Sequence, residues 1–138
     1  MPSKQKSFFN WGRNTMITPK QAQPKNLLDL KKATNKKSFI ITGNQRSFGD
    51  VALNNKLIIS MKNFNKIIRF DDKKGIIELQ SGILLKDVLP VIVKKGWIFP
   101  VTPGTKYVSI GGMVANNIHG KNTHKNQIKF YVKEIKLL

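Results

Sequence analysis

The sequence predicts an α+β domain in which short strands are joined by loops and interrupted by a few helices. Three observations support this prediction: apolar, β-branched runs of strand length, one amphipathic segment with helical spacing, and glycine-containing loops that follow extended segments. The chain has 138 residues, which is enough for one compact domain with its own core. We expect a basic N-terminal arm over residues 1–25 and a globular part over residues 26–138.

The expected elements follow in chain order. Asn26 predicts the N-cap of a short helix that ends near Lys32. A second helix is expected where apolar residues recur with helical spacing and Gly96 ends the pattern. The predicted ranges are strands at 38–42, 57–61, 66–70, 75–80 and 130–138, a tight turn at 71–74, and the second helix at 84–95.

The charge balance is strongly basic, with 25 lysines and arginines against 7 acidic residues and a net charge of +18. Such a balance is compatible with nucleic acid, an anionic membrane surface or a merely solvated surface. The scarcity of arginine favours the last of these and argues against a nucleic-acid partner. The absence of cysteine excludes disulfides and thiolate ligands. A cytoplasmic protein is expected, with association at a membrane surface as the alternative.

Two glycine-containing loops carry residue types that suit a phosphate group. The first begins at Gly43 after a predicted strand, and Gly49 gives its backbone freedom to form an anion-binding concavity. The second, residues 109–112, precedes a stretch with helical character, whose N-terminus favours anions. Neither loop has the pattern of a P-loop or of a dinucleotide-binding turn. The pair therefore predicts a nucleotide-like ligand outside those two classes.

A polar segment at residues 116–124 contains both histidines of the chain, His119 and His124. Their spacing of five does not match a helical zinc pair, and no carboxylate or cysteine lies nearby as a further ligand. No metal site is expected there. The hydrogen-bonding side chains of this segment instead suggest contact with a polar cofactor or substrate.

Four motifs match one known family in order and spacing: WGR at residues 11–13, GNQRSFGD at 43–50, TPGT at 102–105 and SIGGMVANNIHGKN at 109–122. On these motifs the chain resembles the FAD-binding, PCMH-type domain of the vanillyl-alcohol-oxidase-type flavoproteins, and within them the decaprenylphosphoryl-β-D-ribose oxidase group. The resemblance implies small mixed β-sheets flanked by helices. It also implies that the FAD domain continues past Leu138 and is followed by a substrate domain, so that the present chain is incomplete at its C-terminus.

The resemblance implies roles for individual residues. His119 and Lys121 are expected to face the substrate side of the flavin as the catalytic pair. Members of the family usually carry a glycine where Gln45 stands, and the histidine that bonds covalently to the flavin in several relatives corresponds to Arg46, so non-covalent FAD is implied. The implied cofactor-binding residues are Gly43, Asn44, Gln45, Arg46, Ser47, Phe48, Gly49, Asp50, Gly104, Ser109, Ile110, Gly111, Gly112, Asn116, Asn117, Ile118 and His119.

The function implied is that of an FAD-binding module in an oxidoreductase that transfers hydride from the CH–OH group of a sugar, polyol or lipid-linked sugar to FAD. The alternative is a catalytically silent fragment, from a truncated or split gene, that needs a second polypeptide carrying the missing domain. A basic binder of nucleic acid or anionic lipid is a third and weaker hypothesis.

Overall fold

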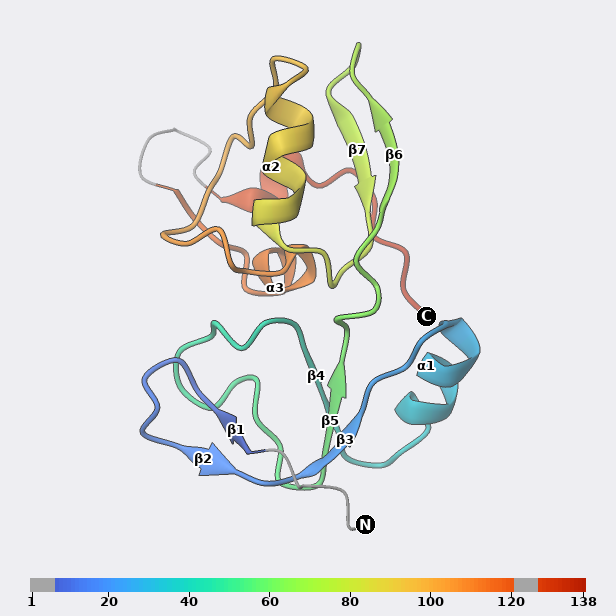
Figure 1. The fold of residues 1–138 in the computed structure, drawn as a ribbon, viewed down its shortest axis with the longest axis vertical. Helices are drawn as coiled ribbons and strands as arrows, with labels where there is room; N and C mark the ends of the chain where they lie inside the picture. The colour runs from blue at the N-terminus through green and yellow to red at the C-terminus, as the bar shows by residue number, and fades with distance from the viewer. Residues whose placement is uncertain (1–6, 121–126) are drawn as a thin grey trace. The chain divides into compact units, whose positions relative to one another are not determined.

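The computed structural model describes residues 7–120 and 127–138, and the chain divides into two compact units, Met1–Phe64 and Asn65–Leu138. Figure 1 shows short strands in small sheets together with a few short helices in the described part of the chain. The α+β class predicted from the sequence is confirmed. Among the described residues, no helix is both long enough and apolar enough to span a membrane.

The first unit is built around a three-stranded parallel sheet with the strand order β3-β5-β4. The central strand, β5, is buried along most of its length, as expected for a parallel strand covered on both faces. A separate antiparallel ribbon, β1-β2, precedes the sheet. The elements are β1 (Phe8–Phe9), β2 (Met16–Ile17), β3 (Lys20–Ala22), α1 (Leu27–Thr34), β4 (Ile40–Thr42) and β5 (Leu57–Ser60).

Helix α1 begins where the sequence predicts it. The Asn26 side chain accepts a hydrogen bond from the Asp29 backbone N–H at 2.9 Å, which satisfies one of the unpaired donors of the first turn. Leu30 then packs against Ile59, Met61 and Phe64 in the core of this unit. The cap and this single buried leucine fix which face of the short helix points inward.

The second unit combines a β-hairpin with two helices. Its apolar residues form two clusters, one between the hairpin and α2 and one between α2, α3 and η1. The fully buried Val88 lies in the first cluster and the fully buried Met113 in the second. The elements are β6 (Ile67–Asp71), β7 (Ile76–Leu79), α2 (Leu85–Val93), α3 (Ile110–Ala115) and the 3₁₀ helix η1 (Ile128–Tyr131).

Two sequence expectations differ from the structure. The strand expected at 130–138 is wrong, because η1 occupies Ile128–Tyr131 and no strand follows in residues 132–138. The segment expected to be an arm contains β1, β2 and β3, and Phe8 within it is buried. A strand forms only where another strand pairs with it, and the sequence alone does not reveal the partner. Residues 130–138 form no strand in the structure, whereas β1 pairs with β2 and β3 pairs with β5.

Candidate flavin-binding segments

The loop over residues 43–50 leaves the end of β4 and bends twice. Gln45 has a φ of 53° and Gly49 a φ of 63°, so both residues adopt the left-handed conformation. Glycine adopts this conformation at low cost, whereas glutamine pays a steric penalty of about 1–2 kcal/mol. The backbone at Gln45 therefore follows the path that a glycine would favour, although the residue is not glycine.

Two buried polar atoms at this corner have no hydrogen-bond partner within the described residues: Oγ1 of Thr42 and Nε2 of Gln45. Thr42 is the last residue of β4 and is only 3% exposed, and Gln45 lies three residues further on. A buried donor or acceptor left unpaired costs about 1–3 kcal/mol, so such atoms point to a missing partner. A hydroxyl and an amide N–H can both donate to a phosphate oxygen, so these two atoms make the first loop suitable for a phosphate group.

The tip of the β1-β2 ribbon braces the same loop. The Trp11 backbone N–H donates to the Ser47 carbonyl at 3.2 Å, and the Arg46 guanidinium lies over the Trp11 ring, 4.7 Å from its centroid. The turn itself is closed by the Arg13 N–H, which donates to the Asn10 carbonyl at 3.1 Å. The first and second of the four sequence motifs thus contact each other within the first unit.

The second glycine-containing segment begins helix α3, and three of its backbone N–H groups already donate to acceptors inside the second unit. The Ile110 N–H donates to the Ile83 carbonyl at 2.9 Å, and the Gly111 N–H donates to the Ser81 carbonyl at 2.8 Å. The Gly112 N–H donates to the capping hydroxyl of Ser109 at 3.3 Å. A phosphate group therefore finds none of these three N–H groups available. Cofactor contacts by residues 109–112 stay a prediction, and they would have to use other atoms.

Gly104 and Gly111 differ in how much space a side chain would have. A Cβ placed on Gly111 would lie 2.8 Å from Cβ and 2.9 Å from the carbonyl oxygen of Ser81, while one placed on Gly104 would meet nothing within 4 Å. Gly111 is thus required for the close packing of α3 against the residue 81 backbone. Gly104, in the TPGT turn, is open to its surroundings.

The polar residues after α3 terminate the helix. Asn117 adopts a φ of 42°, its N–H donates to the Val114 carbonyl at 2.9 Å, and the Ile118 N–H donates to the Met113 carbonyl at 3.1 Å. These two bonds form a Schellman motif, in which asparagine is the usual substitute for glycine. The Asn116 side chain also donates to the Gly112 carbonyl at 2.8 Å. Helix capping therefore accounts for part of the motif that the sequence assigned to the cofactor.

Asn117 also binds residues that follow the fourth motif, which spans residues 109–122. Its side-chain amide donates to Oε1 of Gln127 at 3.2 Å and its Oδ1 accepts from the Lys129 N–H at 3.2 Å. His119 is exposed and forms an isolated antiparallel bridge with Gln127. Lys121 and His124 lie outside the described residues. The catalytic roles predicted for His119 and Lys121 stay predictions.

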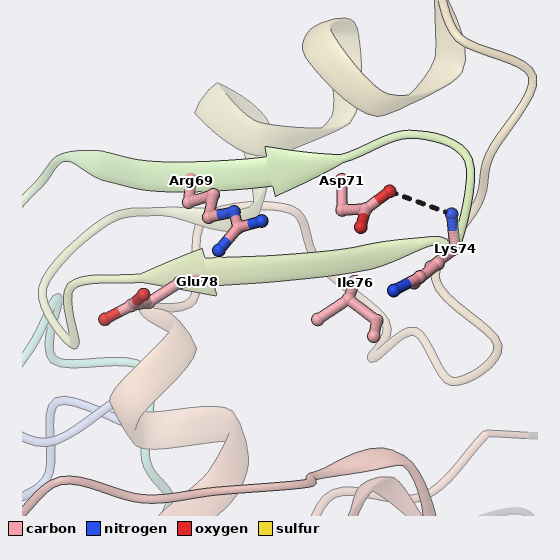
Figure 2. Close-up of a pocket in the computed structure, with 5 residues that line it drawn as sticks. All are labelled: Arg69, Asp71, Lys74, Ile76 and Glu78. Carbon is pink, nitrogen blue, oxygen red and sulfur yellow. Dashed lines mark hydrogen bonds between the residues drawn. The ribbon is translucent and has the colours of Figure 1, made fainter.

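An open cavity of about 270 Å³ lies on the β6-β7 hairpin, and its lining was not predicted from the sequence. Figure 2 shows its five lining residues, Arg69, Asp71, Lys74, Ile76 and Glu78.

The two carboxylates that line this cavity, those of Asp71 and Glu78, form hydrogen bonds with neighbouring residues. The Asp71 carboxylate accepts from the Lys74 backbone N–H at 3.1 Å and stabilises the turn. The Glu78 carboxylate accepts from Nζ of Lys136 at 3.1 Å, and this hydrogen bond raises the pKa of Lys136. Within the described residues, no group of three His, Asp or Glu side chains is placed to hold a metal ion.

The geometry of the loops does not by itself identify the family of this chain, but comparison with known families does. Residues 22–138 match the FAD binding domain family. The chain belongs to that family. The match includes three of the four motifs, those at residues 43–50, 102–105 and 109–122, and it confirms the resemblance inferred from the sequence.

Several curated relatives of this FAD binding domain are oxidoreductases. Decaprenylphosphoryl-beta-D-ribose oxidase of Mycolicibacterium smegmatis is 28% identical over 130 residues, which cover 89% of this chain and 28% of that protein. L-gulonolactone oxidase of Mus musculus is 26% identical over 129 residues, or 88% of this chain and 28% of that protein. D-lactate dehydrogenase of Anaerostipes hadrus is 35% identical over 77 residues, or 56% of this chain and 16% of that protein. The chain thus spans less than a third of the length of each of these relatives.

Proposed function

We propose that this chain is the FAD-binding part of a flavin-dependent oxidoreductase that acts on the CH–OH group of a sugar, a polyol or a lipid-linked sugar. The relatives named above support this class, since their names describe oxidation of a sugar derivative, a lactone and a hydroxy acid. The observation that carries the proposal lies where β4 enters the 43–50 loop. There Oγ1 of Thr42 and Nε2 of Gln45 are buried without a hydrogen-bond partner among the described residues, and Gln45 and Gly49 adopt the left-handed conformation. In this proposal the loop holds the pyrophosphate of FAD.

The proposed attachment is non-covalent. A covalent bond to the flavin requires a nucleophilic side chain such as histidine or cysteine, and the 43–50 loop contains neither. Arg46 occupies the position that carries the flavin-linked histidine in several members of the family, and a guanidinium stays protonated and is not a nucleophile. The rest of the chain has no cysteine.

When bound, FAD supplies the hydride-accepting chemistry, and the protein supplies position and electrostatics. In the proposed mechanism Arg46 adds positive charge beside the pyrophosphate, and its stacking on Trp11 limits the rotamers open to it. His119 orients the reacting end of the substrate or flavin, and Lys121 offsets negative charge there. Asn117 positions this segment by closing α3 and by binding residues 127 and 129.

Purified chain mixed with FAD is expected to retain visible flavin absorbance through gel filtration and to release it into the supernatant after acid precipitation. FAD at one hundred times its Kd is expected to stabilise the fold by about 2.7 kcal/mol, because only the folded state binds. Thermal melting with and without FAD measures this stabilisation as a rise of several degrees in Tm. AMP serves as the control for the adenosine half alone. Flavin that stays with the precipitate would contradict non-covalent attachment, and an unchanged Tm with no co-eluting flavin would contradict the cofactor proposal.

Gln45 offers a sharper test of the loop. The Gln45→Gly variant is expected to be more stable without FAD by about 1 kcal/mol, because it removes the left-handed strain and the unpaired amide. It is expected to bind FAD about tenfold more weakly, because Gln45 is only half-buried and its side chain can rotate its amide toward a bound phosphate. Urea unfolding and FAD titration measure the two effects.

The Gln45→Ala variant is the matched control. It loses the amide but keeps a Cβ at a φ of 53°, so it is expected to share the loss in FAD affinity while gaining less stability than the glycine variant. Wild-type FAD affinity in both variants would show that the Gln45 amide does not contact the cofactor.

The need for a second polypeptide stays an alternative proposal. It is supported by the share of the relatives that this chain matches, 28% in the case of decaprenylphosphoryl-beta-D-ribose oxidase. Turnover of a sugar or polyol by the isolated chain loaded with FAD would contradict it. FAD binding without turnover, followed by turnover on addition of a co-purifying chain, is the result it predicts.

A further inference from the structure

Helix α1 exposes an apolar and basic face that the first unit does not cover. Leu27 is 58% exposed and Leu28 is 71% exposed, and Lys31 and Lys32 follow one turn later, also exposed. At about 100° per residue, these four residues occupy one continuous arc of roughly 140° on the helix. The arc is called the α1 outer face below.

The orientation of α1 is fixed by contacts on its opposite side. Leu30 is buried among Ile59, Met61 and Phe64, and Ala33 packs against the same cluster. The Asn26 cap fixes the first turn. The leucines of the α1 outer face are therefore not needed by the core of this unit, and their exposure leaves apolar area in water.

The surroundings of the α1 outer face are positively charged. Lys25, Lys36 and Lys37 are exposed just before and after the helix. Asp29 is the only acidic residue between positions 1 and 49, and its carboxylate accepts from the Lys25 backbone N–H at 3.3 Å. Within residues 7–120 and 127–138, none of the five lysines from 25 to 37 forms an ion pair with an acidic side chain. Ion pairs within the described residues therefore do not neutralise the positive charge of this face.

We propose that the α1 outer face docks on an anionic lipid bilayer. Leu27 and Leu28 enter the boundary between headgroups and acyl chains, while Lys31 and Lys32 bind the anionic headgroups. A bilayer accounts for both halves of the face. Nucleic acid would account for the lysines but offers no place for two protruding leucines. This surface role is independent of cofactor binding.

Sedimentation of the full chain with phosphatidylcholine vesicles, with and without phosphatidylserine, tests the proposal. Binding is expected only when phosphatidylserine is present and is expected to weaken as salt is raised. The Leu27→Ala/Leu28→Ala variant is expected to lose at least tenfold in partitioning, because less apolar area is buried in the bilayer. The Lys31→Gln/Lys32→Gln variant is expected to lose about 25-fold, since each lysine contributes about a fivefold factor.

The second unit provides a matched control. Val93 and Ile98 are 53% and 74% exposed and lie close in sequence to Lys94 and Lys95, of which Lys95 is paired with Asp72 at 3.0 Å. The Val93→Ala/Ile98→Ala variant therefore removes exposed apolar side chains from a surface outside α1 and leaves the α1 outer face intact. Its partitioning is expected to equal that of the wild type. Circular dichroism checks that helix α1 survives, and alanine is the best helix former.

The leucine variant gives the decisive result. If it binds phosphatidylserine vesicles as well as the wild type does, the binding reflects only the net charge of +18 and the proposal is overturned. Equal binding to neutral vesicles would also overturn it. Single-stranded DNA provides a further test. If DNA competes with the vesicles for the protein, and if the Leu27→Ala/Leu28→Ala variant binds DNA as tightly as the wild type, the α1 outer face is a general polyanion binder instead.

Discussion

The Gly111→Ala variant is expected to lose about 2–3 kcal/mol of unfolding free energy in the absence of any cofactor. The new Cβ would lie 2.8 Å from Cβ of Ser81 and 2.9 Å from its carbonyl oxygen. A backbone carbonyl cannot rotate away as a long side chain can, so α3 must move. That movement lengthens the Gly111 to Ser81 hydrogen bond, which is 2.8 Å in the native structure, and disturbs the packing of the fully buried Met113.

Replacing glycine by alanine also raises helix propensity by about 1 kcal/mol. This gain is smaller than the loss from the steric clash and the lengthened hydrogen bond, and the expected change in unfolding free energy already includes it. Urea unfolding followed by far-UV circular dichroism measures the change. Gly104→Ala is the control, because a Cβ at Gly104 meets nothing within 4 Å and its φ is not in the left-handed region. The control is expected to remain within about 0.5 kcal/mol of the wild type.

The comparison separates two roles for the double glycine. If Gly111 serves only the close approach of FAD, its alanine variant keeps the stability of the cofactor-free protein and loses FAD affinity alone. If packing against Ser81 is the reason for glycine, the loss appears before FAD is added. Unchanged stability of the cofactor-free variant would therefore show that the contact with Ser81 is not the constraint.

The elements that the sequence predicted well are those determined by local residue choice. The run at residues 57–61 is apolar and β-branched, and β5 occupies Leu57–Ser60. Asn26 and Gly96 mark helix ends through their own side chain or backbone freedom, and both act as expected. The tight turn at 71–74 also appears, closed by the Asp71 side chain. In each case the signal and the structure lie within a few residues of each other.

The features that the sequence did not reveal depend on residues far apart in the chain. Ser81 and Gly111 are thirty positions apart, so the steric demand on Gly111 cannot be recognised from the glycine pair itself. The apolar residues after position 129 suggested a strand, but the Ile128 N–H donates to the Ile118 carbonyl and the chain turns into η1. The brace between Trp11 and Arg46 joins two motifs that the sequence presents separately.

The Gly75→Ala variant is expected to destabilise the β6-β7 hairpin by about 2–3 kcal/mol, through left-handed strain and overpacking. Gly75 has a φ of 64°, which costs a residue with a Cβ about 1–2 kcal/mol. The added Cβ would also lie 2.5 Å from Cη2 and 2.8 Å from Cε3 of Trp97. To relieve this clash the indole must move, and it then loses the 2.7 Å hydrogen bond from its Nε1 to the Asp72 carbonyl.

Gly96 provides the matched control for the backbone contribution. Its φ is 78°, and a Cβ there meets nothing within 4 Å. Gly96→Ala is therefore expected to cost only the left-handed penalty of about 1–2 kcal/mol. Urea unfolding of both variants gives the difference between them, which is the contribution of the contact with Trp97. Equal losses in the two variants would show that the indole moves aside without cost.

A double-mutant cycle isolates that contact. The clash needs both the Cβ at position 75 and the indole, so the Gly75→Ala/Trp97→Ala variant is expected to lose less stability than the sum of the two single losses. The shortfall is expected to exceed about 0.5 kcal/mol, the limit within which independent sites add. The Asp72 to Lys95 ion pair at 3.0 Å is common to all four proteins of the cycle and cancels from the comparison. Strict additivity would mean that Trp97 does not constrain the turn, and the left-handed backbone alone would then explain why position 75 is glycine.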